Sequence, residues 1–197
     1  MDHAGYLSPA PDSEGARRLY DEDLEDSGYV MNLTRVWAHQ PEAIDRLTQL
    51  LGEATEASGL SLRQRGVLVT TVAATLGDSY CALAWGQKLV DAAGTDVAVA
   101  ALTGSDEGLA PDERALAAWA RQVVRDPSGT TAADVQALRD AGFDEGQVVA
   151  ITVYVAGRLA FSTVNDALGA QPDAELRSSV DPAVQAAVTW GRPVAEA

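Results

Sequence analysis

Cysteine and histidine are scarce in this sequence. Among 197 residues there is one cysteine, Cys81, and there are two histidines, His3 and His39. A single cysteine excludes an internal disulfide framework and an all-cysteine zinc site, and it suits a reducing compartment. Two histidines are too few for a histidine-rich metal centre. We therefore expect neither a resident metal nor another cofactor.

Positive charge is also scarce. Asp and Glu (29) outnumber Lys and Arg (14), which gives a formal net charge of -15 and a pI near 4.3. Nucleic acids and anionic membranes attract concentrated Lys and Arg, so we expect neither as a partner. The N-terminal sequence shows no secretory signal, and no uncharged apolar run is long enough to span a bilayer. The expected location is the cytoplasm.

The sequence lacks strict apolar–polar alternation between hairpin turns, so we expect no β-strands. Apolar residues recur instead at three- and four-residue steps, which indicates helices. Residues 41–58 begin at Pro41, a favoured first helical position, and end before Gly59. Residues 62–76 and 147–168 are apolar on nearly every side, as in helices that other helices surround. The β-branched residues of 62–76 also allow a strand, but the length of the segment favours a helix. The other expected helices are 16–26, 29–37, 79–93, 96–102, 111–126, 132–141 and 182–188.

The chain is long enough for one hydrophobic core, with 47% hydrophobic residues. The predicted fold class is all-α, with about eight to ten helices in a single domain over residues 16–190. Residues 1–15 mix Pro, Gly, Ser and Asp without periodicity, which predicts a mobile N-terminal arm. Residues 191–197 are expected to form a tail.

A series of short motifs follows these helices in order. They are Gly28-Tyr29-Val30, Asn32-Leu33, Ala38-His39-Gln40-Pro41-Glu42, Leu60-Ser61-Leu62-Arg63-Gln64-Arg65, Tyr80-Cys81, Leu109-Ala110-Pro111-Asp112-Glu113-Arg114-Ala115-Leu116, Val123-Val124-Arg125-Asp126-Pro127 and Asp166-Ala167-Leu168-Gly169. In this order they resemble the alkylhydroperoxidase D (AhpD)-like family, which includes the carboxymuconolactone decarboxylases, and especially its peroxidase-related branch. The resemblance covers most of the chain and implies an AhpD-like helical fold that assembles into a homo-oligomer (dimer, trimer or hexamer).

The resemblance also implies a site from which most redox residues are missing. Redox-active members carry a glutamate early in the first buried helix, a CxxC, and a histidine four residues after the second cysteine. In this sequence the glutamate falls on Gly66, the first cysteine on Asp78 and the histidine on Trp85, and only Cys81 matches. The family's Asn-Arg pair in the last long helix falls on Ser162-Thr163. A dithiol cycle needs two sulfurs and a proton relay, so this cycle is lost.

The candidate catalytic residues are Asp78, Tyr80 and Cys81. Asp78 is either an acid or base, or only the cap of the helix that begins at Ser79. Its carboxylate disfavours a thiolate at Cys81, whereas the helix N-terminus favours one. Cys81 is therefore either a reactive thiol or a small buried apolar residue. Tyr80 either serves the site or packs.

The candidate substrate-binding residues are Ser79, Trp85, Arg158 and Ser162. Trp85 either walls a pocket for an organic ligand or fills a cavity. Arg158 lies in an apolar helix and needs a partner: a structural ion pair is the first interpretation and a substrate carboxylate the second. His39 is the remaining general base by residue type, although its place between helices favours packing or capping.

Three functions stay open at this stage. The favoured one is a non-redox reaction, such as proton transfer, cyclisation or decarboxylation, on a small organic molecule in the inherited apolar pocket. The second is a single-cysteine alkylhydroperoxidase-like oxidoreductase that uses Cys81. The third is a non-catalytic binding or assembly protein.

Overall fold

The computed structural model describes residues 5–196. Residues 1–4 of the expected arm and residue 197 of the expected tail lie outside this range. Within it the chain forms eleven α-helices, one 3-10 turn and no strand, so the all-α prediction is confirmed. The elements are α1 (Glu14–Ser27), α2 (Asn32–Trp37), α3 (Pro41–Ser58), α4 (Leu62–Leu76), α5 (Ser79–Ala93), α6 (Thr95–Thr103), α7 (Pro111–Arg125), η1 (Pro127–Gly129), α8 (Ala132–Asp140), α9 (Glu145–Ala167), α10 (Leu176–Ser179) and α11 (Pro182–Ala187).

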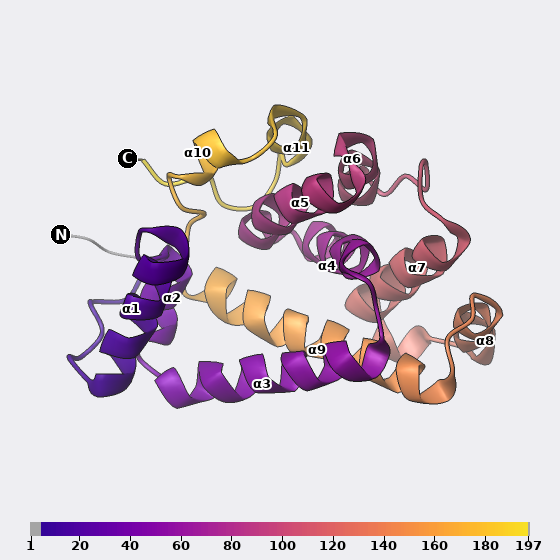
Figure 1. Cartoon of the computed structure of the whole chain (residues 1–197), viewed down its shortest axis with the longest axis horizontal. Helices are drawn as coiled ribbons and strands as arrows, with labels where there is room; N and C mark the ends of the chain where they lie inside the picture. The colour runs from indigo at the N-terminus through magenta and orange to yellow at the C-terminus, as the bar shows by residue number, and fades with distance from the viewer. Residues whose placement is uncertain (1–4, 197) are drawn as a thin grey trace.

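Helix α4 is the centre of the fold. It begins with a capping box in which the Ser61 hydroxyl accepts from the Gln64 backbone and the Gln64 side chain accepts from the Ser61 backbone. It ends at Gly77, whose φ of 86° lies in the left-handed region that glycine favours. Helices α5, α6, α7 and α9 all pack on α4, and α3 lies alongside α9 (Figure 1). The expected burial of α4 on nearly every side is therefore observed.

Two hydrophobic clusters meet at α4 and form most of the core. Leu68 and Val72 face a cluster built with α7, α8 and α9, which contains the fully buried Leu116 and Ile151. Val67 faces a second cluster built with α5, α6 and α11. One helix thus supplies both halves of the core, which fixes α5 and α9 relative to each other across α4.

Residues near the two ends of the described chain, Tyr6 and Arg192, meet beside the start of α5, and the C-terminal segment ends on the same side of the molecule as α1 (Figure 1). The Tyr6 backbone N–H donates to the Leu168 carbonyl at 2.9 Å, and Arg192 donates to the Tyr6 hydroxyl at 2.9 Å. Arg192 also donates to the Asp166 carbonyl at 2.7 Å, and its own carbonyl accepts from the Ser79 hydroxyl at 2.8 Å. Residues from both ends are therefore attached to the end of α9 and the start of α5.

Helix α9 is the longest helix in residues 5–196 and is apolar along most of its length, as the sequence predicts. By length and composition it could cross a membrane, with a mean hydropathy of 1.4 over its most apolar window. Of that window 44% is buried inside the protein, and α9 packs against α3, α4 and α7. The core helix of a soluble protein meets the same criteria, so this finding is weak support for a membrane span.

Candidate functional site

Asp78 caps the N-terminus of α5. Its Oδ1 accepts a hydrogen bond from the Cys81 backbone N–H at 2.9 Å, as an N-cap carboxylate does. The side chain is fully buried, and Oδ2 has no hydrogen-bond partner. The capping role predicted for Asp78 is therefore observed. Its second carboxylate oxygen, Oδ2, has no hydrogen-bond partner and lies near the Cys81 thiol.

Cys81 lies in the first turn of α5, where two side chains of α9 reach its sulfur. Its residue is 4% exposed, and Sγ accepts a hydrogen bond from Arg158 Nη2 at 3.1 Å. The Ser162 hydroxyl, one turn further along α9, lies 3.8 Å from the same sulfur. Burial raises the pKa of the thiol to about 12; the positive charge of Arg158 opposes the rise, and the carboxylate of Asp78 adds to it. At neutral pH this thiol is protonated.

Arg158 is buried without a carboxylate partner. It is 8% exposed, and none of the ion pairs found within residues 5–196 includes it. Its guanidinium carbon lies 4.8 Å from the ring centre of Phe161 and 5.7 Å from that of Trp85, and its Nε has no hydrogen-bond partner. The structural ion pair expected for this arginine is therefore absent from the described part of the chain.

Trp85 stands one turn after Cys81 on α5 and is surrounded by cations. The guanidinium carbon of Arg65 on α4 lies 5.4 Å from its ring centre, and Nζ of Lys88 lies 4.8 Å from it. Partial desolvation lowers the pKa of Lys88, and the charges of Arg158 and Arg65 lower it further. Trp85 packs against the core cluster that α4, α7, α8 and α9 build, and three positive groups lie over its ring.

Helix α4 presents a residue to Trp85 that the sequence interpretation did not choose. That residue is Arg65, whereas a Cβ on Gly66, the position assigned to the family's glutamate, would lie 3.0 Å from Leu89. The carried-over position therefore faces the core, and α4 brings a positive charge to Trp85. Arg65 and Lys88 were not among the candidate site residues. The available signal was that Lys88 is the only lysine in the sequence.

Three other candidates are attached elsewhere. The Tyr80 hydroxyl donates to the Asp173 carboxylate, and both residues are buried. Ser79 lines a separate cavity of about 320 Å³ with residues of the C-terminal segment, and donates to that segment. His39 Nε2 is paired with the Ser8 carbonyl at 3.0 Å. The structure thus brings together Asp78, Cys81, Trp85, Arg158 and Ser162, and it gives Tyr80, Ser79 and His39 structural contacts.

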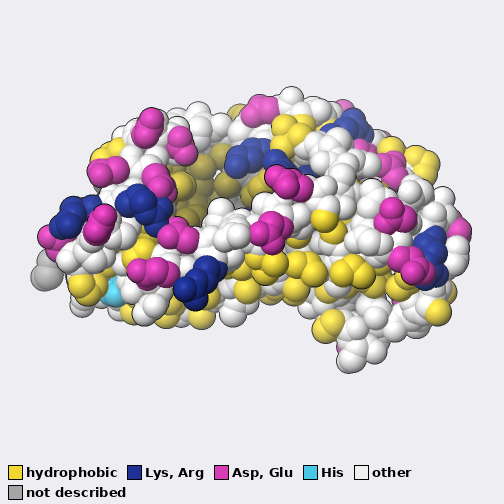
Figure 2. Space-filling view, turned by 60° about the horizontal axis from the view of Figure 1, so that its bottom comes forward, with side chains coloured by type: hydrophobic (Ala, Val, Ile, Leu, Met, Phe, Trp, Pro, Cys, Tyr) yellow, Lys and Arg dark blue, Asp and Glu magenta, His cyan; other side chains and the backbone are white. Residues whose placement is uncertain are grey.

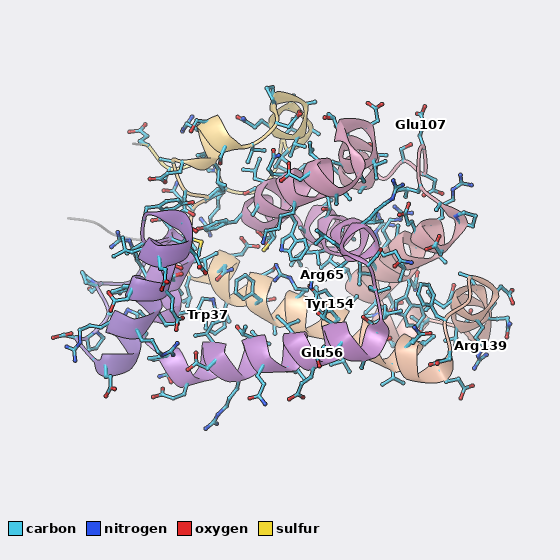
Figure 3. All side chains as sticks on the ribbon, in the orientation of Figure 1. Trp37, Glu56, Arg65, Glu107, Arg139 and Tyr154 are labelled. Carbon is cyan, nitrogen blue, oxygen red and sulfur yellow. The ribbon has the colours of Figure 1, made fainter. Side chains whose placement is uncertain are left out.

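One face of the molecule is hollowed. Figure 2 shows a depression lined by hydrophobic side chains, with Lys and Arg gathered at its edge and Asp and Glu spread over the surrounding surface. In Figure 3 the side chains of Arg65 and Tyr154 lie in the space between α4 and α9. Tyr154 is 4% exposed, and burial raises its pKa while Arg158 and Arg65 oppose the rise. Over the described residues no group of three His, Cys, Asp or Glu side chains is arranged to hold a metal ion.

The fold is the AhpD-like helical fold, as the comparison with solved structures shows. An uncharacterized peroxidase-related protein from Ralstonia eutropha, described as an alkylhydroperoxidase AhpD core, matches with a TM-score of 0.72 at 22% identity, over 89% of this chain and 96% of that one. A peroxidase-related protein from Silicibacter matches with a TM-score of 0.76 at 19% identity, over 90% and 96%. The fold predicted from the sequence resemblance is therefore confirmed.

A third similar structure is that of an enzyme. The debrominase Bmp8 matches with a TM-score of 0.65 at 14% identity, over 91% of this chain and 94% of that one. A cysteine-to-alanine variant of Bmp8 has been crystallised with 2,3,4-tribromopyrrole. No protein-family model matches this sequence, and no curated protein matches it. At these identities the likeness establishes the fold alone.

Proposed function

We propose that this protein is a cofactor-independent enzyme that carries out a non-redox reaction on a small organic molecule in the hollow beside Cys81 and Trp85. The observation that carries the proposal is Arg158, a buried guanidinium 3.1 Å from the Cys81 sulfur with no carboxylate partner in the described chain. A buried unpaired charge is costly to keep, and groups with perturbed environments in a hollow concentrate at functional sites.

The chemistry follows from the charges around the site. In proton transfer next to a carbonyl, in cyclisation through an enolate and in decarboxylation, negative charge develops on the substrate. Arg158 and Arg65 are fixed near Trp85 and would stabilise that charge. The protonated Cys81 thiol would donate a proton to the substrate, and the neighbouring Asp78 carboxylate would accept one from it.

A dithiol peroxidase cycle does not fit these residues. The sequence has one sulfur of the required kind, and Asp78 and Trp85 stand where the resemblance places a second cysteine and a histidine. The remaining thiol is buried, and its raised pKa keeps it protonated. The supporting observations thus favour proton chemistry over sulfur oxidation in this hollow.

One observation favours a second candidate function, single-thiol chemistry at Cys81. A guanidinium that donates to the sulfur stabilises a thiolate once one is formed. One of the similar structures is a debrominase whose cysteine was replaced for crystallisation with an organic ligand. In this alternative the Cys81 thiolate would attack a hydroperoxide, breaking its O–O bond to release an alcohol and leave a sulfenic acid. Two equivalents of an added thiol would then return Cys81 to the thiol, with loss of water and formation of the disulfide of the added thiol.

Two assays on the purified protein test the proposal. In the first, tert-butyl hydroperoxide consumption is followed with dithiothreitol as reductant, in wild type and in Cys81→Ser. We expect no turnover above the rate without protein in either case. Robust peroxide turnover that Cys81→Ser abolishes would establish the second candidate function and overturn the first.

The second assay follows proton transfer directly. Deuterium incorporation from D2O into the carbon next to the carbonyl of phenylpyruvate is measured by proton NMR. We expect wild type to accelerate exchange and Arg158→Met to lose most of that acceleration, since the charge that stabilises the enolate is gone. Arg46→Gln, an exposed arginine on α3 with no hydrogen bond or ion pair in the described structure, is the matched control. Equal exchange rates with wild type and Arg158→Met would contradict the proposal.

A further inference from the structure

Three of the protein's 14 Lys and Arg side chains gather around the Trp85 ring. The protein carries a net charge of -15, and five of its arginines form ion pairs with Asp or Glu. Arg65, Lys88 and Arg158 have no such partner anywhere in residues 5–196, although the sequence has 29 acidic residues. Like charges repel, so an anion bound among the three cations would relieve their mutual repulsion.

The three cations also differ in depth. Lys88 is exposed, Arg65 is partly buried, and Arg158 is 8% exposed next to the Cys81 sulfur. The Nε atoms of Arg65 and Arg158 are both buried and both lack a hydrogen-bond acceptor. A carboxylate is the acceptor that a guanidinium binds best, with two parallel hydrogen bonds. Because the three cations lie at increasing depth between the solvent and the Cys81 thiol, they would attract an anion from solution and favour its binding near the thiol.

The walls next to these cations are aromatic. Trp85 and Phe161 both have the Arg158 guanidinium over their rings, and Phe161 stacks on Trp37 with ring centres 5.9 Å apart. Tyr154 is close enough to Arg158 and Arg65 for their charges to act on its hydroxyl. Aromatic and apolar lining favours a ligand with a flat or apolar body rather than a small inorganic anion.

We infer that the substrate of this site is a small organic acid, whose carboxylate binds to Arg65, Lys88 and Arg158 while its apolar body lies against Trp85 and Phe161. The inference rests on the proposed function for the location of the site, and it adds the class of molecule. In this arrangement the carboxylate accepts hydrogen bonds from the Nε atoms of Arg65 and Arg158, which have no other acceptor. The atoms next to the carboxylate then lie towards Cys81 and Asp78.

The test compares an acid with its neutral amide and needs no turnover. Isothermal titration calorimetry measures binding of phenylacetate and of phenylacetamide to the intact protein. We expect phenylacetate to bind at least about tenfold more tightly, and Arg65→Gln and Lys88→Gln each to weaken phenylacetate binding by about tenfold with little effect on the amide. Arg46→Gln removes the same charge from the exposed side of α3 and should leave both affinities unchanged.

Because Lys88 is the only lysine, a second readout is specific to this site. Reductive methylation with formaldehyde and a borohydride reagent modifies Lys88 and the N-terminal amine, which peptide mass spectrometry separates. Phenylacetate should slow methylation of Lys88, and phenylacetamide should not. The N-terminal amine is the internal control, because its rate should stay the same with either compound.

Two results would overturn the inference. One is equal affinity for acid and amide, or an effect of Arg46→Gln as large as that of Arg65→Gln. The other is a change of assembly mass by light scattering in Arg65→Gln or Lys88→Gln with phenylacetate affinity unchanged, which would assign the cations to a contact between subunits. Failure of the proposed function would look different from failure of this inference. Peroxide turnover by a protein that binds phenylacetate more tightly than phenylacetamide would refute the non-redox reaction and still support an organic acid as the ligand.

Discussion

Alkylation of Cys81 should be slow in the folded protein, and the structure gives the size of the effect. At pH 8 a thiol with an ordinary pKa near 9 is about one-tenth thiolate, whereas a pKa of about 12 leaves about one thiolate in ten thousand. The more basic thiolate is intrinsically more nucleophilic, which recovers about twentyfold of this thousandfold difference. The raised pKa alone therefore slows alkylation by about fiftyfold, and the 4% exposure of the residue slows it further.

The assay measures the rate of iodoacetamide addition to Cys81 by intact-mass spectrometry, in buffer and in concentrated urea. Two variants change the pKa in opposite directions. Arg158→Met removes a charge that lowers the thiol pKa, so it should react more slowly than wild type. Asp78→Asn removes a charge that raises it and keeps a residue that caps helices well, so it should react faster.

The two substitutions should change the alkylation rate of Cys81 in opposite directions. A folded-state rate within about fivefold of the rate in urea would show that the thiol is already activated, and would favour single-thiol chemistry. Equal rates in both variants, or changes in the same direction, would show that charge at Asp78 and Arg158 does not control the thiol. Either result refutes the reasoning that Cys81 rests as a protonated, protected group.

Three predictions concern the support of the site, each measured as the free energy of unfolding in urea. Burial and the nearby Asp78 raise the pKa of Asp166 to about 6, so the contribution of this carboxyl to stability is present below pH 4 and is lost as the pH rises through 6. Asp166→Asn should therefore stabilise the protein by about 1 kcal/mol at pH 7 and not at pH 4. The same difference between variant and wild type at both pH values would contradict this. Tyr80→Phe removes the hydroxyl that donates to buried Asp173 and should cost about 1–3 kcal/mol, while an unchanged midpoint would show that this hydrogen bond contributes nothing. Gly86→Ala places a Cβ 2.7 Å from a methyl carbon of Val184 and should cost about 1–3 kcal/mol, which a neutral result would disprove.

The helices were predictable where capping residues mark their ends. The predicted ranges 41–58, 62–76 and 79–93 agree with α3, α4 and α5. Pro41 starts the first of these, and Gly59 and Gly77 end the first two in the left-handed conformation. These are local signals that need no knowledge of the tertiary structure, and for that reason sequence reasoning finds them.

Errors occur where the signal is weak or the helix is short. Helix α1 begins at Glu14, not Ala16, because the Ser13 hydroxyl caps it from within the expected arm. Helix α10, only four residues long, was not expected, and α9 begins at Glu145, two residues earlier than predicted. A single turn has no periodicity to recognise, and a cap within a polar segment resembles its neighbours.

The candidate site was predictable only in part, for a geometric reason. Asp78, Cys81 and Trp85 lie on one stretch of α5, and the sequence identifies them together. The approach of Arg65 to Trp85 depends on how α4 crosses α5, and no local pattern encodes which face of α4 is presented there. The same crossing decides that Gly66 faces Leu89, and the position of α9 decides that Arg158 has the thiol rather than a carboxylate as its neighbour.

The contact between Tyr6 and Arg192 makes the described chain almost a closed ring. These residues are 186 positions apart and are joined by a hydrogen bond of 2.9 Å and by the Arg192 guanidinium over the tyrosine ring. A short linker could therefore join the two ends, and new ends could be opened in the exposed loop that contains Gly104 and Gly108. Such a circular permutant changes which helix is synthesised first and leaves the packing of α4, α5 and α9 as it is. Its folding would show whether the order of the helices matters to this fold, or only their contacts.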